Sequence, residues 1–255
     1  MPHVDWNCSL DTWRDILPLC PDATFFHTPE WYLARAATTA IEVRPVHFAF
    51  DDGSRAVLPL AVRPRYRGLL QEAVVGLENG YGGLLSPQSL RAGQIEAAYR
   101  HVRRRFPDLA VVGNPHATGH QVPEAARQSM DITHVLPVRP PDEQLAGYTE
   151  PRARHVLQAQ RSGLRIEVIE GLDAQSAARI YPLYAKHAAA WRYTKWVRDE
   201  AYFRTLASRA GRHLTLFLAH EGDRVVGLHL VAAYPPVAIQ LHLATDGAYN
   251  RQNPA

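Results

Sequence analysis

The sequence predicts a layered α/β protein made of two similar halves, each with a mixed central sheet flanked by helices. The order helix, helix, three strands, helix, strand recurs on both sides of Pro140-Pro141. In the first half, Asp51-Asp52-Gly53 joins two strand-like segments, which is a strong hairpin signal. The chain ends in three further strand-like segments. We therefore expect a first half over residues 1–140. Residues 141–255 are expected to form the second half.

The first half opens with a clear helix start at Thr28-Pro29-Glu30. Thr28 can cap the helix, Pro29 suits the first helical position, and Glu30 favours the positive end of the helix dipole. The expected helices of this half are 10–19, 31–37 and 89–105, its strands are 42–50, 54–62, 109–113 and 132–137, and its loops include 79–83 and 117–124.

The second half alternates long helical and strand-like segments. Gly147 and Pro151 are expected to break its first helix into two pieces, and Gly163 to end it. Pro182 is expected to kink the next long helix unless the missing hydrogen bond is accommodated. The expected helices are 143–161, 173–191 and 198–210, and the strands are 164–169, 214–220, 224–233 and 237–245.

Composition is that of a globular protein. Of 255 residues, 46% are apolar and 21% are charged, and the net charge of +3 is too small to indicate nucleic-acid binding by itself. The two cysteines fit neither a zinc site nor a disulfide framework. There is no signal-peptide pattern, and the apolar runs are too short to span a bilayer. We expect a cytoplasmic protein with no membrane span and no permanently bound cofactor.

A metal site is not expected. His116 and His120 have the i, i+4 spacing of helical metal ligands, but Pro115 and Gly119 indicate a loop there. No third ligand is evident in the sequence.

The last two strands predict a hairpin with one apolar and one polar face. If Pro235-Pro236 is the turn, His229 lies opposite His242. The polar face then carries Gly227, His229, Gln240, His242, Ala244 and Asp246, and the apolar face carries Leu228, Leu230, Ala232, Ile239, Leu241 and Leu243.

This polar face supplies three candidate catalytic residues. We expect His229 and His242 to form a cross-strand pair, with β-carbons roughly 5 Å apart, that acts as general base and proton shuttle. Asp246 is a second candidate base, and Gln240 is a candidate substrate-binding residue. The alternatives are a solvent-facing sheet surface with two histidines by chance, and an Asp246 that caps the following turn.

Four segments resemble the FemAB family, whose members have two GNAT-like halves joined by a helical connection. The resemblance implies that residues 141–255 form this connection and a partial second half. Residues 25–31 (FFHTPEW) resemble its opening FFQ-x-PxW, and residues 81–87 (YGGLLSP) resemble its YGGPLSP loop. Residues 154–164 (RHVLQAQRSGL) are similar to its RNIRKAxKxGL helix end, and the strand ending at Ala244-Thr245-Asp246 is similar to those that open its donor site.

The resemblance implies an N-acyltransferase that moves an acyl or aminoacyl group from an activated donor onto an amine. Acyl-CoA and aminoacyl-tRNA are the expected donors, and a small molecule or peptide amine is the expected acceptor. Trp31, Tyr81, Gly82 and Gly83 match positions near the family's acceptor cleft, although Trp31 is equally suited to a core position.

Two arginines are candidates for binding an anionic group of the acceptor. Arg154 and Arg161 share a helix face and could clamp a phosphate or carboxylate. The resemblance favours this interpretation because the family has an acceptor-binding arginine in this helix. The alternative is a solvated helix face.

The arginines at the end of the helix 89–105 form a second basic cluster. Arg100, Arg103, Arg104 and Arg105 suit the negative end of the helix dipole without any ligand. A tRNA or another phosphate-rich partner is the alternative.

The sequence departs from the family pattern in two places. His155 stands where the family has asparagine, and residues 251–255 match the family's acyl-CoA loop poorly. We expect either a truncated second half or a protein that lacks part of the donor site. A naturally short chain would be a catalytically incomplete binding protein for an anionic or peptide ligand, or would complete its sheet in a homodimer or with another partner chain.

Overall fold

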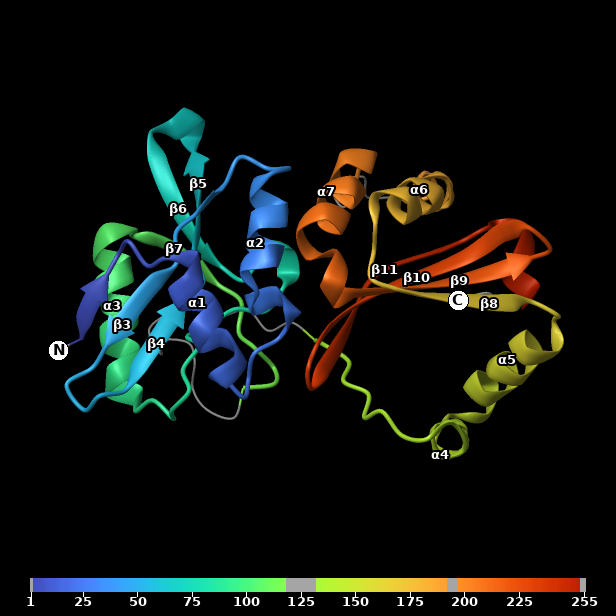
Figure 1. Ribbon diagram of the computed structural model, residues 1–255, viewed down its shortest axis with the longest axis horizontal. Coiled ribbons are helices and arrows are strands. Elements are labelled where there is room, and N and C mark those ends of the chain that lie inside the picture. Colours follow the sequence, from blue (N-terminus) through green and yellow to red (C-terminus); the bar gives the residue numbers. More distant parts are fainter. Residues whose placement is uncertain (1, 118–131, 192–196, 253–255) are drawn as a thin grey trace. The chain divides into compact units, whose positions relative to one another are not determined.

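The computed structural model describes residues 2–117, 132–191 and 197–252, which divide into two compact units. The described residues up to 117, together with Ala233–Ala238, make the first unit, and the remaining described residues make the second. Both units combine sheets with flanking helices (Figure 1), so the predicted α/β fold class is confirmed. The expected domain limits, 1–140 and 141–255, stay a prediction.

The first unit contains two sheets. One has the order β1-β3-β4 and is antiparallel, and the other has the order β2-β5-β6-β7 and is mixed, because β6 and β7 run parallel. Its strands are β1 (His3–Asp5), β2 (Glu42–Val43), β3 (Val46–Ala49), β4 (Arg55–Leu58), β5 (Ala61–Arg65), β6 (Leu70–Val75) and β7 (Asp108–Val111). Its α-helices are α1 (Leu10–Ile16), α2 (Pro29–Ala36) and α3 (Ala92–Arg105), and its 3-10 turns are Leu17–Leu19, Phe25–His27, Tyr66–Gly68 and Leu77–Asn79.

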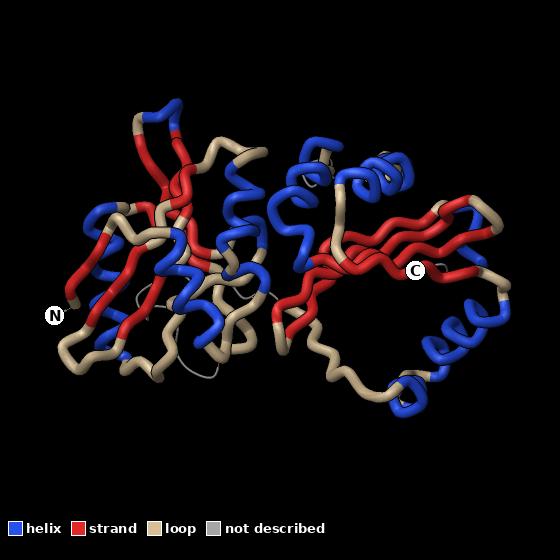
Figure 2. Tube along the Cα trace, in the orientation of Figure 1, coloured by secondary structure: helices blue, strands red, loops and turns tan. Residues whose placement is uncertain are grey.

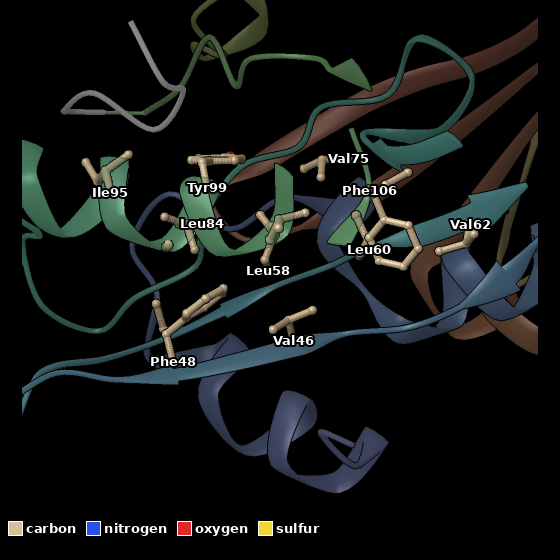
Figure 3. Close-up of a cluster of buried hydrophobic side chains, with 14 of the residues drawn as sticks. Val46, Phe48, Leu58, Leu60, Val62, Val75, Leu84, Ile95, Tyr99 and Phe106 are labelled. Atoms are coloured by element: carbon tan, nitrogen blue, oxygen red, sulfur yellow. The ribbon is translucent and has the colours of Figure 1, made fainter. Parts of the chain in front are cut away.

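The core of the first unit lies between its strands and helix α3. Figure 3 shows Phe48 and Leu58 from the strands facing Tyr99 from α3, and all three side chains are fully buried. Leu84 belongs to the same cluster. It therefore anchors the loop that contains residues 79–83 to the hydrophobic core.

The second unit is built on one sheet with the order β11-β10-β9-β8. Its strands are β8 (Arg165–Glu170), β9 (Leu214–Glu221), β10 (Arg224–Tyr234) and β11 (Val237–Thr245). Its α-helices are α4 (Pro141–Ala146), α5 (Glu150–Arg161), α6 (Ala174–Ala188) and α7 (Glu200–Ala210), and its 3-10 turns are Gly211–His213 and Gly247–Gln252.

Helices α6 and α7 cover one face of this sheet (Figures 1 and 2). Leu218 and Leu228 are paired across β9 and β10 and are buried on the covered face. The other face exposes Ile166, Val168 and Phe217. One face of the sheet therefore packs against helices, whereas the other exposes apolar side chains.

Several predicted elements are confirmed. The hairpin at Asp51-Asp52-Gly53 joins β3 and β4, and Gly53 has the positive φ (81°) that the turn requires. Thr28 caps α2 by accepting a hydrogen bond from the Trp31 N–H (3.2 Å). The helix 143–161 divides into α4 and α5 as expected, and α6 runs through Pro182.

Other predictions were wrong. Residues 132–137 form no strand, since they pair with no strand in the described part of the chain and their side chains are exposed. The strand 54–62 is two strands of different sheets, β4 and β5, which separate at Pro59. Strands β1 and β6 were not predicted, and most of the predicted loop 117–124 lies outside the described residues.

Candidate functional site

The segments 25–31 and 81–83, which are far apart in the sequence, contact each other in the first unit. The Phe26 ring lies 5.3 Å from the Trp31 ring and 5.5 Å from the Tyr81 ring, measured between centroids. Trp31 is buried, and Tyr81 is partly exposed. The sequence predicted both Trp31 and Tyr81 as substrate-binding residues, and the structure places them on two sides of Phe26.

Gly82 and Gly83 let the loop after Tyr81 lie directly on the backbone of its neighbours. The Gly82 N–H donates to the Val112 carbonyl (2.8 Å). A Cβ at Gly82 would lie 2.5 Å from the Gly76 nitrogen, and Gly83 has a φ of 141°. Close packing at Gly82 and the backbone conformation at Gly83 therefore explain these two glycines without a ligand. Tyr81 is the side chain of this loop that is placed to contact a ligand.

We expect Gly82→Ala to lower the free energy of unfolding by about 1–3 kcal/mol, because backbone atoms of Val75 and Gly76 cannot move away from the new methyl group. Chemical denaturation of the purified variant measures the change. Gly93→Ala is the matched control, since a Cβ there meets no atom within 4 Å. Equal stability of the two variants would contradict the close packing of this loop.

His27 is a buried residue of the 25–31 segment that lies next to the 81–83 loop. Its Nδ1 accepts a hydrogen bond from the Thr24 backbone N–H (3.1 Å). Burial lowers the pKa of His27 to about 4, the Gly82 backbone acts in the opposite direction, and His116 lowers it further. A neutral, buried His27 thus lies where the two motifs meet.

His116 completes the cluster. Its ring lies 5.7 Å from the Tyr81 ring, and its backbone N–H donates to the Asn114 side chain (3.1 Å). Sequence reasoning considered His116 only as a metal ligand, while His120 lies outside the described residues. No group of potential metal ligands occurs among the residues that the structure describes. Phe26 and His116 were not predicted as site residues, because their ring contacts with Tyr81 span fifty-five and thirty-five residues and leave no local pattern.

A hollow of about 300 Å³ lies in the same unit, at the end of α2. Arg35 lies there almost fully buried and pairs with Glu78, and its guanidinium is 5.9 Å from the Trp31 ring centroid. The lining residues are Arg35, Thr39, Ala40, Ile41, Arg63, Pro64, Val74, Leu77 and Glu78. The hollow thus combines an apolar wall with a partly buried ion pair.

His242 lies in the second unit, on the helix-covered face of its sheet. Its Nε2 is 2.9 Å from the Tyr202 hydroxyl of α7. Its ring also contacts Phe203 (5.2 Å) and Tyr184 (5.5 Å). An imidazole that hydrogen-bonds to a phenol in an aromatic enclosure can accept a proton and pass it on.

His229 does not pair with His242, so the predicted cross-strand pair was wrong. His229 is opposite Phe217 on β9, and their ring centroids are 6.3 Å apart on the face away from α6 and α7. Burial lowers the pKa of His229, and the Gln240 side chain acts in the opposite direction. The structure thus brings Gln240 to His229, as the predicted polar face required, but turns His242 to the other face.

Asp246 forms a structural ion pair. Its buried carboxylate lies 2.8 Å from Lys186 Nζ and 2.5 Å from the Arg224 guanidinium. It also accepts a hydrogen bond from the Ala248 N–H (3.2 Å), so it caps the following turn. The Lys186 interaction holds the pKa of Asp246 below its usual value, which makes the carboxylate a weak base.

Arg154 and Arg161 lie on the exposed helix α5, which has no buried residue. Arg154 pairs with Glu150 one turn earlier (2.7 Å), and both side chains are largely exposed. This geometry is that of a solvated helix face. A clamp for an anionic group stays a prediction.

Comparison with known proteins shows that the fold of this chain is similar to that of a solved structure. No protein-family model matches the sequence, and a search of curated proteins found no match. The crystal structure of FemX superposes with a TM-score of 0.67 at 10% identity, covering 99% of this chain and 82% of FemX. The chain has a Fem-type fold. At 10% identity, this similarity establishes the fold and nothing about activity.

The Fem-type fold agrees with the tandem α/β layout predicted from the sequence. No helix in the described part of the chain is long and apolar enough to cross a bilayer.

Proposed function

We propose that this Fem-type chain is an N-acyltransferase that joins an acyl or aminoacyl group to an amine by direct attack of the amine on an activated donor. The observation that carries the proposal is the meeting of the Phe26–Trp31 and Tyr81–Gly83 segments. These two segments resemble separate FemAB motifs in sequence, and they contact each other in the structure. The likeness to FemX supports the same class at the level of fold.

In this proposal, Tyr81 and His116 form a substrate-binding surface of the first unit. Both lie at the partly exposed side of the cluster, while Phe26 and Trp31 form its buried support. A rigid, buried support fixes the ring of Tyr81 and lowers the conformational entropy lost on binding.

His242 is the proposed general base. An amine attacks only after its ammonium proton has been removed, and an imidazole is suited to that task near neutral pH. Tyr202 orients the ring through Nε2 and takes part in passing the proton onward. Asp246 and His229 are weaker candidates, because the first is neutralised by two cations and the second faces away from α6 and α7.

The donor is proposed to be either acyl-CoA or aminoacyl-tRNA. A thermal-shift screen against acetyl-CoA, longer acyl-CoAs, charged tRNA and peptidoglycan precursors separates them, since a ligand that binds the native state raises the melting temperature. We expect a rise of several degrees with one donor class, and acyl transfer to an amine when donor and acceptor are combined.

The alternative function is a binding protein for an anionic or peptide ligand that does not turn over. The hollow with the partly buried Arg35–Glu78 pair favours it, since a ligand could be held there without chemistry. Stabilisation by an acceptor alone, with no donor shift and no product, would support this alternative and contradict the transferase proposal.

A further inference from the structure

The β5–β6 hairpin carries exposed apolar side chains at its tip. Figure 1 shows the hairpin projecting beyond the rest of the first unit. At its turn, Tyr66 is 73% exposed, Leu69 is 85% exposed, and Leu70 is 55% exposed. Exposed large apolar residues that adjoin each other usually mark a surface that is covered in function.

The same hairpin is positively charged. Arg63 and Arg65 approach Glu72 at 2.5 and 2.9 Å, and both guanidinium side chains remain about half exposed. Arg67 adds a further positive charge at the turn. With three arginines and one carboxylate between Ala61 and Val75, the hairpin has a net charge of +2.

The turn itself has an unfavourable backbone. Tyr66 and Arg67 have φ angles of 48° and 61°, in the left-handed region that side chains other than glycine rarely adopt. The positive φ angles raise the energy of the folded state, and the exposed apolar side chains at this turn add little packing to offset that energy. Such costs are typical of sites that a function maintains.

We propose that this hairpin docks the protein onto an anionic lipid surface. Tyr66, Leu69 and Leu70 enter the headgroup region, Arg67 pairs with lipid phosphates, and the half-exposed Arg63 and Arg65 add to the positive charge. Aromatic and leucine side chains bordered by arginine are the combination that binds at the bilayer interface.

The shape of the hairpin favours lipid over other partners. A narrow, convex tip can enter a fluid layer, whereas a protein partner would need a matching pocket. Single-stranded RNA would gain from stacking on Tyr66 and from the arginines, but gains little from two adjacent leucines.

Vesicle co-sedimentation tests the proposal. We expect the full chain to bind vesicles of phosphatidylcholine with phosphatidylglycerol and not vesicles of phosphatidylcholine alone. Tyr66→Ser with Leu69→Ser should weaken binding at least about tenfold, because two insertion side chains are lost. Arg67→Glu should weaken it roughly five- to tenfold, and added salt should weaken it further.

Matched controls keep the result specific. Leu19→Ser removes another exposed leucine of the first unit, and Arg55→Glu makes the same charge change on an exposed residue of β4. Both control variants should bind vesicles as the parent chain does. Unchanged thermal unfolding of all four variants excludes misfolding as the cause of weaker binding.

A fluorescent label locates the contact. Cys8 and Cys20 are buried, and burial raises the pKa of their thiols to about 11 and about 12, so a new exposed cysteine reacts selectively at neutral pH. An environment-sensitive dye on Leu69→Cys should shift to the blue with anionic vesicles, while the same dye on Leu19→Cys should not.

Three outcomes would overturn the proposal: vesicle binding that the tip variants leave unchanged, no binding to anionic vesicles, or a dye shift with RNA but not with vesicles. The transferase activity proposed above is measured with soluble substrates. Either proposal can therefore fail without the other.

Discussion

Replacing His242 with alanine is expected to lower kcat roughly 100- to 10,000-fold, the usual contribution of a general base. The structure leaves His242 as the candidate base whose ring hydrogen-bonds to a phenol, since its Nε2 is 2.9 Å from Tyr202. Steady-state kinetics with the donor identified by the ligand screen measures the loss. KM should change little, because the base acts mainly in the transition state.

Companion variants test the role of the ring. His242→Gln keeps a polar group near Tyr202 but cannot take a proton at neutral pH, so it should be as inactive as the alanine variant. Tyr202→Phe keeps the imidazole and should shift the pH dependence of kcat. His134→Ala removes an exposed histidine and should have no effect. If His229→Ala abolishes turnover while His242→Ala does not, the assignment of the base is wrong.

Acid is expected to destabilise the protein by roughly 3 kcal/mol between pH 7 and pH 4 through His27 alone. Burial lowers the pKa of His27 to about 4, whereas an unfolded histidine titrates near 6.5. The unfolded chain therefore binds more protons in this window, so the stability present above pH 6.5 is lost as the pH falls through 4. Urea unfolding at several pH values measures the slope.

His27→Asn separates this contribution from that of other groups. Asparagine can still accept the Thr24 N–H bond but does not titrate, so the variant should have a flatter profile between pH 6.5 and 4. His134→Asn, at an exposed position, should keep the parent profile. Parallel profiles for parent and His27→Asn would show that His27 does not titrate as described.

The elements of the fold could largely be predicted from local signals, whereas the register of the final hairpin could not. The expected pairing put Thr245 opposite Val226, but the backbone hydrogen bond to the Val226 carbonyl comes from Asp246 (2.8 Å). Between the turn and this bond, β11 therefore carries one residue more than β10. Because side chains alternate in a strand, a shift of one residue moves a side chain to the other face. His242 consequently points to α6 and α7.

The site in the first unit was predicted in part. Trp31 and Tyr81 were found through their motifs, but their common neighbour Phe26 was not assigned a role. Arg35 and Glu78 were not predicted, because a partly buried ion pair across forty-three residues has no signature in the sequence. The ion pair of Asp246 was missed for the same reason, although its turn-capping role was foreseen as the alternative.

Strand β8 has a consequence for which substitutions the chain tolerates. It is the last strand of its sheet in the described part of the chain, and Ile166 and Val168 on it are exposed. The free edge of a strand with exposed apolar side chains can pair with a strand of another molecule, and charged residues discourage such pairing. Glu167 lies between the two apolar residues and is held by Arg179 and His220. We therefore expect the charge of Glu167, besides its ion pairs inside the molecule, to discourage this edge from pairing with a second copy.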